Sequence, residues 1–191
     1  ETAVVESRHR ASCAVVAADG TIVHGWGDIE QQVFPRSAIK PIQALPLIET
    51  GAADAFGYSA AEISLACASH HAEDRHINTV TDILGRIGLT PDALECGPKI
   101  SIDEAVKIER LKKGVEARRL GSDCSGKHTG FLATAVHMGE DPAGYIGRSH
   151  PVQQRIFQTI SEMCDVDVST LPEGIDGCSI PALAIPLSAL A

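Results

Sequence analysis

The stretch that decides the fold of this chain is Ser37-Ala-Ile-Lys-Pro-Ile-Gln-Ala-Leu-Pro-Leu-Ile-Glu-Thr-Gly51. Its apolar residues recur at helical spacing, and Gly51 is placed where a helix commonly ends. A proline is tolerated only in the first turn of a helix, so Pro41 places the helix start close to Ser37. Pro46 should then kink the helix or confine it to a short buried piece.

Further elements are predicted on both sides of this helix. Two β-prone runs, 12–17 and 21–26, are joined through Asp19-Gly20, which is a strong hairpin signal. Apolar periodicity predicts helices over 59–67, 75–87, 126–138 and 151–164, and a solvated helix within 99–119. The pattern predicts one α/β domain over residues 1–191.

Composition limits the classes of partner. The 25 acidic and 16 basic residues give a formal charge of −9, which disfavours nucleic acid and anionic membranes. No apolar run approaches the ~18 residues of a membrane span, and the first residues lack the pattern of a signal peptide. The six cysteines are widely spaced, unlike those of a secreted disulfide scaffold. These features predict a soluble cytoplasmic protein with reduced thiols.

The last residues are apolar. The segment 180–187 is too hydrophobic to lie in water, and no later element follows to cover it. We therefore expect a domain incomplete at its C-terminus, whose missing elements come from another chain or from a continuation of this one.

Ser37 and Lys40 form a Ser-x-x-Lys motif. Residues three apart share one face of a helix, so the lysine amine can reach the serine hydroxyl. A serine becomes a nucleophile when a neighbouring group takes its proton, and a lysine that burial keeps neutral can do so. The alternative is that Ser37 caps the helix and Lys40 is a surface charge.

Ser69 is a second candidate, because it lies where an apolar helix changes abruptly to the polar block 69–74. Serine–lysine hydrolases of the β-lactamase type use a second serine as well. An equally good interpretation is a helix-terminal hydroxyl that bonds backbone.

Two cysteines lie in strings rich in polar groups. Asp123-Cys-Ser-Gly-Lys-His128 precedes a predicted helix, and Asp176-Gly-Cys178 forms a turn. Thiols beside His, Lys or Asp can bind a borderline metal such as Zn²⁺. The plainer interpretation is that Ser125 caps the helix and Cys124 packs as a small apolar residue.

Several strings together resemble the rhizobial-type L-asparaginases, the asparaginase II family. They are Val5-Glu-Ser-Arg-His-Arg10, Pro35-Arg-Ser-Ala-Ile-Lys-Pro41, Cys67-Ala-Ser-His70, Glu73-Asp-Arg-His76, Cys124-Ser-Gly-Lys-His128, His150-Pro151 and Asp176-Gly-Cys178. Each string is weak by itself, but seven in order along the chain are specific.

The resemblance implies an α+β sandwich fold like that of serine β-lactamases and glutaminases, with Ser37 as a nucleophile activated by Lys40. It implies that Ser69 belongs to a second serine–lysine pair, whose lysine is absent from this sequence. It further implies one zinc ion on Cys124, Lys127 and Cys178, and a substrate pocket that includes three more residues, namely Arg36, His128 and Asp176. Asp176 is expected to engage the α-ammonium of L-asparagine, and a homodimer is expected.

Three functions remain in competition. The first is an amidohydrolase that converts L-asparagine to L-aspartate and ammonia, and the resemblance favours it. The second is a β-lactam-recognising serine enzyme, against which stands the missing export signal. The third is a non-catalytic zinc-binding or regulatory domain. The sequence leaves the preference for asparagine over glutamine open.

Overall fold

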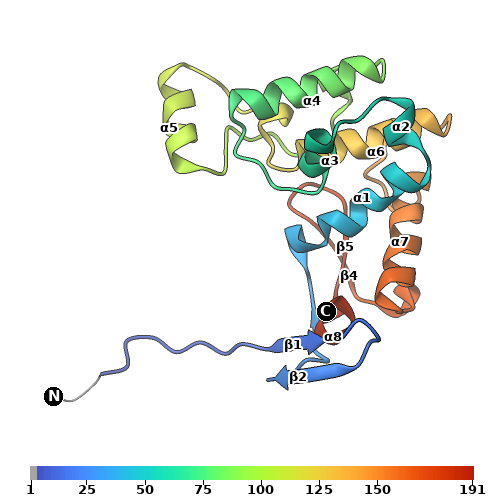
Figure 1. The fold of residues 1–191 in the computed structure, drawn as a ribbon. Helices are drawn as coiled ribbons and strands as arrows, with labels where there is room; N and C mark the ends of the chain where they lie inside the picture. The colour runs from blue at the N-terminus through green and yellow to red at the C-terminus, as the bar shows by residue number, and fades with distance from the viewer. Residues whose placement is uncertain (1–3) are drawn as a thin grey trace.

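The computed structural model describes residues 4–191. In chain order its elements are β1 (Cys13–Val16), β2 (Ile22–Trp26), β3 (Gln32–Val33), η1 (Arg36–Ile39), α1 (Lys40–Glu49), α2 (Ala52–Ala55), α3 (Ala60–Ala66), α4 (Asp74–Arg86), η2 (Pro91–Ala93), α5 (Glu104–Lys112), η3 (Arg119–Gly121), α6 (Ser125–His137), α7 (Pro151–Cys164), η4 (Val168–Thr170), β4 (Glu173–Ile175), β5 (Pro181–Leu183), β6 (Ile185–Pro186) and α8 (Leu187–Leu190), where η denotes a 3₁₀ turn. Most helices gather at one end of the molecule, and the β1–β2 hairpin with α8 lies at the other (Figure 1).

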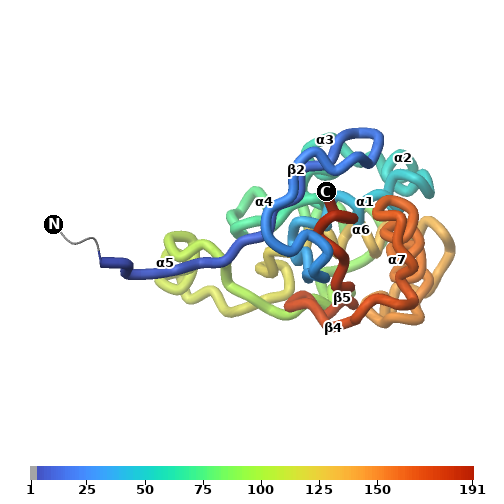
Figure 2. Tube along the Cα trace, turned by 90° about the horizontal axis from the view of Figure 1, so that it is seen from below, coloured from blue at the N-terminus to red at the C-terminus, as the bar shows by residue number. Residues whose placement is uncertain are grey.

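The predicted hairpin is confirmed. β1 and β2 pair antiparallel, and Gly20 in their turn has a φ of 83°, a left-handed conformation that glycine adopts without strain. Residues 4–12, before β1, lead away from the body as an extended segment, which both Figure 1 and Figure 2 show. Among the described residues, the other strand pairs are β3 with β6 and β4 with β5.

Helix α6 is the centre of the core. It packs against α1, α3, α4 and α7, and its residues from Ser125 to Ala135 are all buried. A side chain at Gly126 would come 2.7 Å from the carbonyl oxygen of Leu65, so glycine is what lets α6 approach α3 closely. This close contact brings the start of α6 beside the loop that follows α3.

Helix α1 corrects two details of the expected helix. Ser37 lies in the 3₁₀ turn η1, and the α-helix proper begins at Lys40. Pro46 does not confine the helix to a short piece, because α1 runs through it to Glu49. Packing against α6 and α7 holds the helix together around this buried proline.

The C-terminal apolar segment is covered by the chain itself, contrary to expectation. Ile180, Leu183 and Ile185 are buried and belong to the same core as α1, α6 and α7. Pairing of β5 with β4 and of β6 with β3 turns these side chains inward. Sequence periodicity could not show the pairing of β6, because its partner β3 lies about 150 residues earlier in the chain.

The fold is therefore mixed α/β, as predicted at the level of class. The described strands form separate two-stranded pairs, so the finer expectation of a β-lactamase-like sandwich stays a prediction. None of the described helices is long and apolar enough to cross a bilayer.

Candidate functional site

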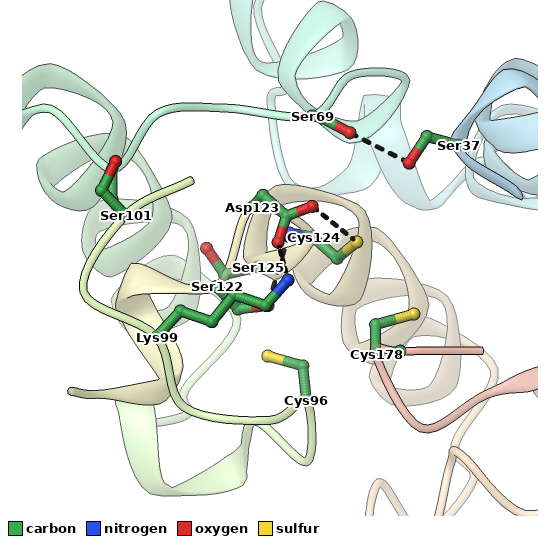
Figure 3. A network of polar contacts seen from close by, with 12 residues as sticks. Ser37, Ser69, Cys96, Lys99, Ser101, Ser122, Asp123, Cys124, Ser125 and Cys178 are labelled. Atoms are coloured by element: carbon green, nitrogen blue, oxygen red, sulfur yellow. Dashed lines mark hydrogen bonds and ion pairs between the residues drawn. The ribbon is translucent and has the colours of Figure 1, made fainter. Parts of the chain in front are cut away.

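Ser37, Ser69 and Lys40 form a continuous line of hydrogen bonds, here called the serine cluster. The Lys40 Nζ donates to Ser69 Oγ at 2.6 Å, and Ser69 Oγ donates to Ser37 Oγ at 3.1 Å. Figure 3 shows the two serine hydroxyls facing each other from separate segments. Ser37 is exposed whereas Lys40 is only 1% exposed, so the line runs from solvent into the core.

The contact within this cluster differs from the one that the Ser-x-x-Lys spacing predicts. The recorded hydrogen bond of the Lys40 amine goes to Ser69, and Ser69 in turn bonds Ser37. The loop after α3 places the Ser69 hydroxyl in this connecting position. An arrangement of this kind gives a nucleophilic hydroxyl an indirect route to a proton acceptor.

Arg36 and Asp176 lie beside the serine cluster as an ion pair. The Nη1 of Arg36 is 3.1 Å from Oδ1 of Asp176, which also accepts the backbone N–H of Gly177 at 2.8 Å. The Arg36 backbone has a φ of 53°, a left-handed conformation that is costly for a residue with a side chain. Strain of this kind clusters at functional sites, and it lies here next to the exposed Ser37 hydroxyl.

Cys124, Lys127 and Cys178 form a second group, here called the thiol cluster. The Lys127 Nζ lies 3.4 Å from Cys178 Sγ and donates to Gln43 Oε1 at 3.3 Å. The neighbouring Cys124 side chain, aided by the charge of Lys127, lowers the pKa of Cys178 to about 6. The closeness of Cys178, together with burial, raises the pKa of Cys124. Of the two thiols, Cys178 is therefore the one that ionises first, beside the buried amine of Lys127.

An ion pair flanks the thiol cluster. Lys99 bonds the carboxylate of Asp123, as Figure 3 shows. Burial opposes ionisation of Asp123, but the hydrogen bond and charge of Lys99 outweigh it and lower the pKa of this carboxyl. The other carboxylate oxygen accepts from the Cys124 thiol at 3.7 Å. Sequence reasoning gave Lys99 no role, because its partner lies 24 residues further along the chain.

His128 lies on helix α6, one residue after Lys127, and is fully buried. Its Nδ1 shares a hydrogen bond of 2.6 Å with the hydroxyl of Tyr145, and within the described residues its Nε2 has no partner. Burial, with the charge of Lys127, keeps the pKa of His128 well below its ordinary value. The ring is therefore neutral. Tyr145 was missed by the sequence reasoning, since no motif surrounds it.

A cavity of about 550 Å³ opens between α3 and α4, with Ser69, His70, Arg75 and His76 in its walls. Ser37 is not part of that wall, and Arg36 and Asp176 border a separate cavity of about 20 Å³. The cavity of about 550 Å³ therefore does not contain the exposed Ser37 hydroxyl, and we place the candidate site at the serine cluster. Ser69 is the residue that joins the large cavity to it.

No three His, Cys, Asp or Glu side chains within residues 4–191 are grouped as a metal site would require. The two thiols of the thiol cluster would need the Lys127 amine as a third donor. Two sulfurs and a nitrogen make a borderline-soft set that zinc accepts.

The exposed hydroxyl, the second hydroxyl bonded to it and the buried amine are of the kinds that a serine-type hydrolase can use. A family model described as L-asparaginase II matches residues 2–191. The chain therefore belongs to the L-asparaginase II family, and at family level this implies an asparaginase-type amidohydrolase. No curated protein matches the chain.

Proposed function

We propose that this protein hydrolyses the side-chain amide of L-asparagine to L-aspartate and ammonia, with Ser37 as the nucleophile. The observation that carries the proposal is the unbroken line from the exposed Ser37 hydroxyl through Ser69 to the buried Lys40 amine. Membership of the L-asparaginase II family supports the reaction class.

The line can move a proton in two stages. For this the two hydroxyls rotate, so that Ser37 donates to Ser69 and Ser69 donates to a neutral Lys40 amine, the reverse of the directions given above. Ser37 Oγ then attacks the amide carbon while its proton passes to Ser69 Oγ, and the Ser69 proton passes to Lys40. The proton returns along the same line to the departing nitrogen, which leaves as ammonia. Water then attacks the Ser37 ester with the same groups acting as base, which releases aspartate and restores the hydroxyl.

Arg36 and Asp176 supply a pair of charges that suits an α-amino acid. A free amino acid carries one carboxylate and one ammonium close together, so it can exchange the 3.1 Å ion pair for two of its own. We assign the α-carboxylate to Arg36 and the α-ammonium to Asp176. Both residues lie near Ser37, since Arg36 is its neighbour in sequence.

We further propose that Cys124, Lys127 and Cys178 hold one zinc ion. Cys178 is already poised as a thiolate because its pKa is about 6, and Lys127 can serve as a ligand once its amine is neutral. A bound zinc ion would supply a fixed positive charge at this place. Because Ser37 supplies the nucleophile, we assign the ion an effect on substrate affinity.

A homodimer and a cytoplasmic location complete the proposal. The hairpin exposes Val15, Ile22, Val23 and Trp26, and apolar side chains gathered on one element favour association. All six cysteines are free thiols, as a reducing compartment maintains them. Sedimentation of the wild type and of Trp26→Ser tests the dimer, which should weaken in the variant.

Ammonia release from L-asparagine and L-glutamine tests the reaction, with Ser149→Ala as a matched exposed-serine control. We expect release from asparagine, loss of it in Ser37→Ala, and normal rates in the control. A wild type that releases no ammonia but acylates with a β-lactam would instead support the β-lactam-recognising alternative. A wild type that binds zinc and shows neither reaction would support a regulatory domain.

A further inference from the structure

His70 follows Ser69 directly and is anchored by three hydrogen bonds. It is 3% exposed. Its backbone N–H donates to the carbonyl of Asp123 at 3.1 Å, its Nε2 lies 2.8 Å from Ser125 Oγ, and its Nδ1 accepts the N–H of Ala72 at 3.1 Å. The residue beside the relay serine is thus bound to the start of α6 by both backbone and ring.

The partners of the ring determine which nitrogen carries the proton. Ser125 uses its single hydroxyl proton to donate to Leu120 O at 3.0 Å, so it can only accept from His70. Nε2 therefore carries the hydrogen, and Nδ1 is the acceptor for Ala72. Independently, burial, with the charge of the neighbouring His76, lowers the pKa of His70 to about 4. Both observations describe a neutral ring in one tautomer.

The segment that the ring holds is conformationally strained. Ala72 has a φ of 56° and is completely buried, and its N–H is the one bonded to His70 Nδ1. A non-glycine residue in this conformation persists only where its surroundings impose it. Through Ser125, the ring ties this loop to helix α6.

We propose that His70 is a positioning residue that fixes the Ser69 hydroxyl between Ser37 and Lys40 by its Nε2–H bond to Ser125. This inference rests on the proposed function. His70 has no recorded hydrogen bond to Ser37 or Lys40, so it acts through its neighbour. A shift of ~1 Å in a group of the reacting line costs about 10²-fold in rate, which is the scale of effect we expect.

Two substitutions separate the roles of the two ring nitrogens. In His70→Gln the amide nitrogen lies where Nε2 was and can still donate to Ser125. In His70→Asn the shorter amide reaches only the Nδ1 position, so the bond to Ala72 survives and the bond to Ser125 is lost. We expect His70→Asn to lower kcat for asparagine about 10²-fold with KM nearly unchanged, and His70→Gln to recover most of kcat. Ser125→Ala should resemble His70→Asn, and combining the two should add little.

His137→Asn and His137→Gln are the matched controls. His137 lies at the far end of α6, about 18 Å along the helix from Ser125 by the usual rise per residue, and its Nε2 bonds the Thr50 carbonyl. Both control variants should keep wild-type kcat. Equal losses in His70→Gln and His70→Asn, or no loss in either, would overturn the positioning role.

Nitrogen-15 NMR of the histidine rings provides a readout that does not depend on activity. The His70 signal should show the neutral Nε2–H pattern in wild type from about pH 5 to about pH 8, where an ordinary histidine titrates. A protonated ring or the other tautomer would overturn the inference even in an active enzyme. An inactive wild type with the expected His70 signal would contradict the proposed function and leave the ring assignment standing.

Discussion

Two buried lysines with different partners distinguish the serine cluster from the thiol cluster. Lys40 and Lys127 are each 1% exposed. The recorded bond of Lys40 goes to a serine hydroxyl, whereas Lys127 contacts Cys178 and Gln43 and lies 5.6 Å from the ring centre of Phe131. A buried lysine can thus serve as a proton acceptor in the serine cluster, and as a positive charge or a metal ligand in the thiol cluster.

Charge balance explains the difference. The thiolate of Cys178 can neutralise a protonated Lys127, so the thiol cluster can hold its charge without solvent. The hydroxyl of Ser69 has no such charge to offer to Lys40. The clusters nevertheless share helix α1, because Gln43 lies one turn after Lys40 on the same helix.

Among the variants that test this difference between the clusters, the largest loss of turnover is expected for Ser37→Ala. Ser37→Ala removes the attacking oxygen and should lower asparaginase turnover by about 10⁴-fold or more. Thermal melting should be unchanged within a few degrees, because the side chain is exposed. Ammonia release under single-turnover conditions measures the loss, and turnover near wild type would mean that neither cluster supplies the nucleophile as proposed.

The next effect compares the two lysines directly. Lys40→Met should lower kcat by about 10²- to 10⁴-fold, the range for loss of a general base. Lys127→Met should leave kcat within about tenfold of wild type, since Lys127 lies outside the relay in the proposed mechanism. Methionine keeps much of the volume of the lysine side chain in both variants but lacks its amine. Steady-state kinetics, with melting curves to check the fold, therefore measures the effect of losing the amine. Equal losses of kcat would remove the distinction between the clusters.

Many of the helices and strands that carry the two clusters can be predicted from local sequence. Asp19-Gly20 sets the hairpin, and helix α6 begins and ends within one residue of the predicted 126–138. Turn chemistry and apolar periodicity are local properties, so a single sequence contains them. The motif strings likewise identified Ser69 and Cys178 as residues to examine.

Hydrogen bonds between segments that are far apart in the chain could not be predicted from local sequence patterns. The position of Ser69 between Ser37 and Lys40 depends on how the loop after α3 meets α1, and the spacing 37–40 indicates only a direct contact. The cap assigned to Ser125 was wrong for the same reason. Its hydroxyl donates backward to Leu120 and accepts from His70, which is 55 residues away. Tertiary packing decides these bonds, and local propensity does not contain it.

A smaller effect on turnover is expected from the thiol cluster. Cys178→Ser replaces a thiolate ligand by a poor one, so zinc per chain after dialysis against trace metal should fall well below that of wild type. KM for asparagine should rise while kcat stays within a few-fold. Elemental analysis with steady-state kinetics measures both. Cys164→Ser, at a buried thiol on α7, is the control and should keep its metal content. Unchanged metal in Cys178→Ser would exclude this cluster as the site.

His70→Gln is expected to have the smallest effect on turnover. Its main effect should be on the free energy of unfolding at acid pH. The folded-state pKa of His70 is about 4, below the ordinary value of 6.5, mainly because the ring is buried. Between these two values the unfolded chain binds a proton that the folded chain does not. Stability due to the neutral ring is therefore present above about pH 6.5 and is lost as the pH falls to about 4.

The pKa difference of His70 corresponds to about 3 kcal/mol of unfolding free energy over that interval. Glutamine does not titrate, so His70→Gln should lose less stability than wild type on acidification, while His137→Gln should follow wild type. His128 beside the thiol cluster remains in both proteins, and its pKa is also depressed. Acid lability left in His70→Gln therefore comes from His128 together with the other groups of lowered pKa, among them His76 and Glu140. Urea unfolding at intervals from pH 7 to pH 4 gives the curves. Parallel curves for wild type and His70→Gln would mean that His70 is not the neutral buried ring that the serine cluster requires.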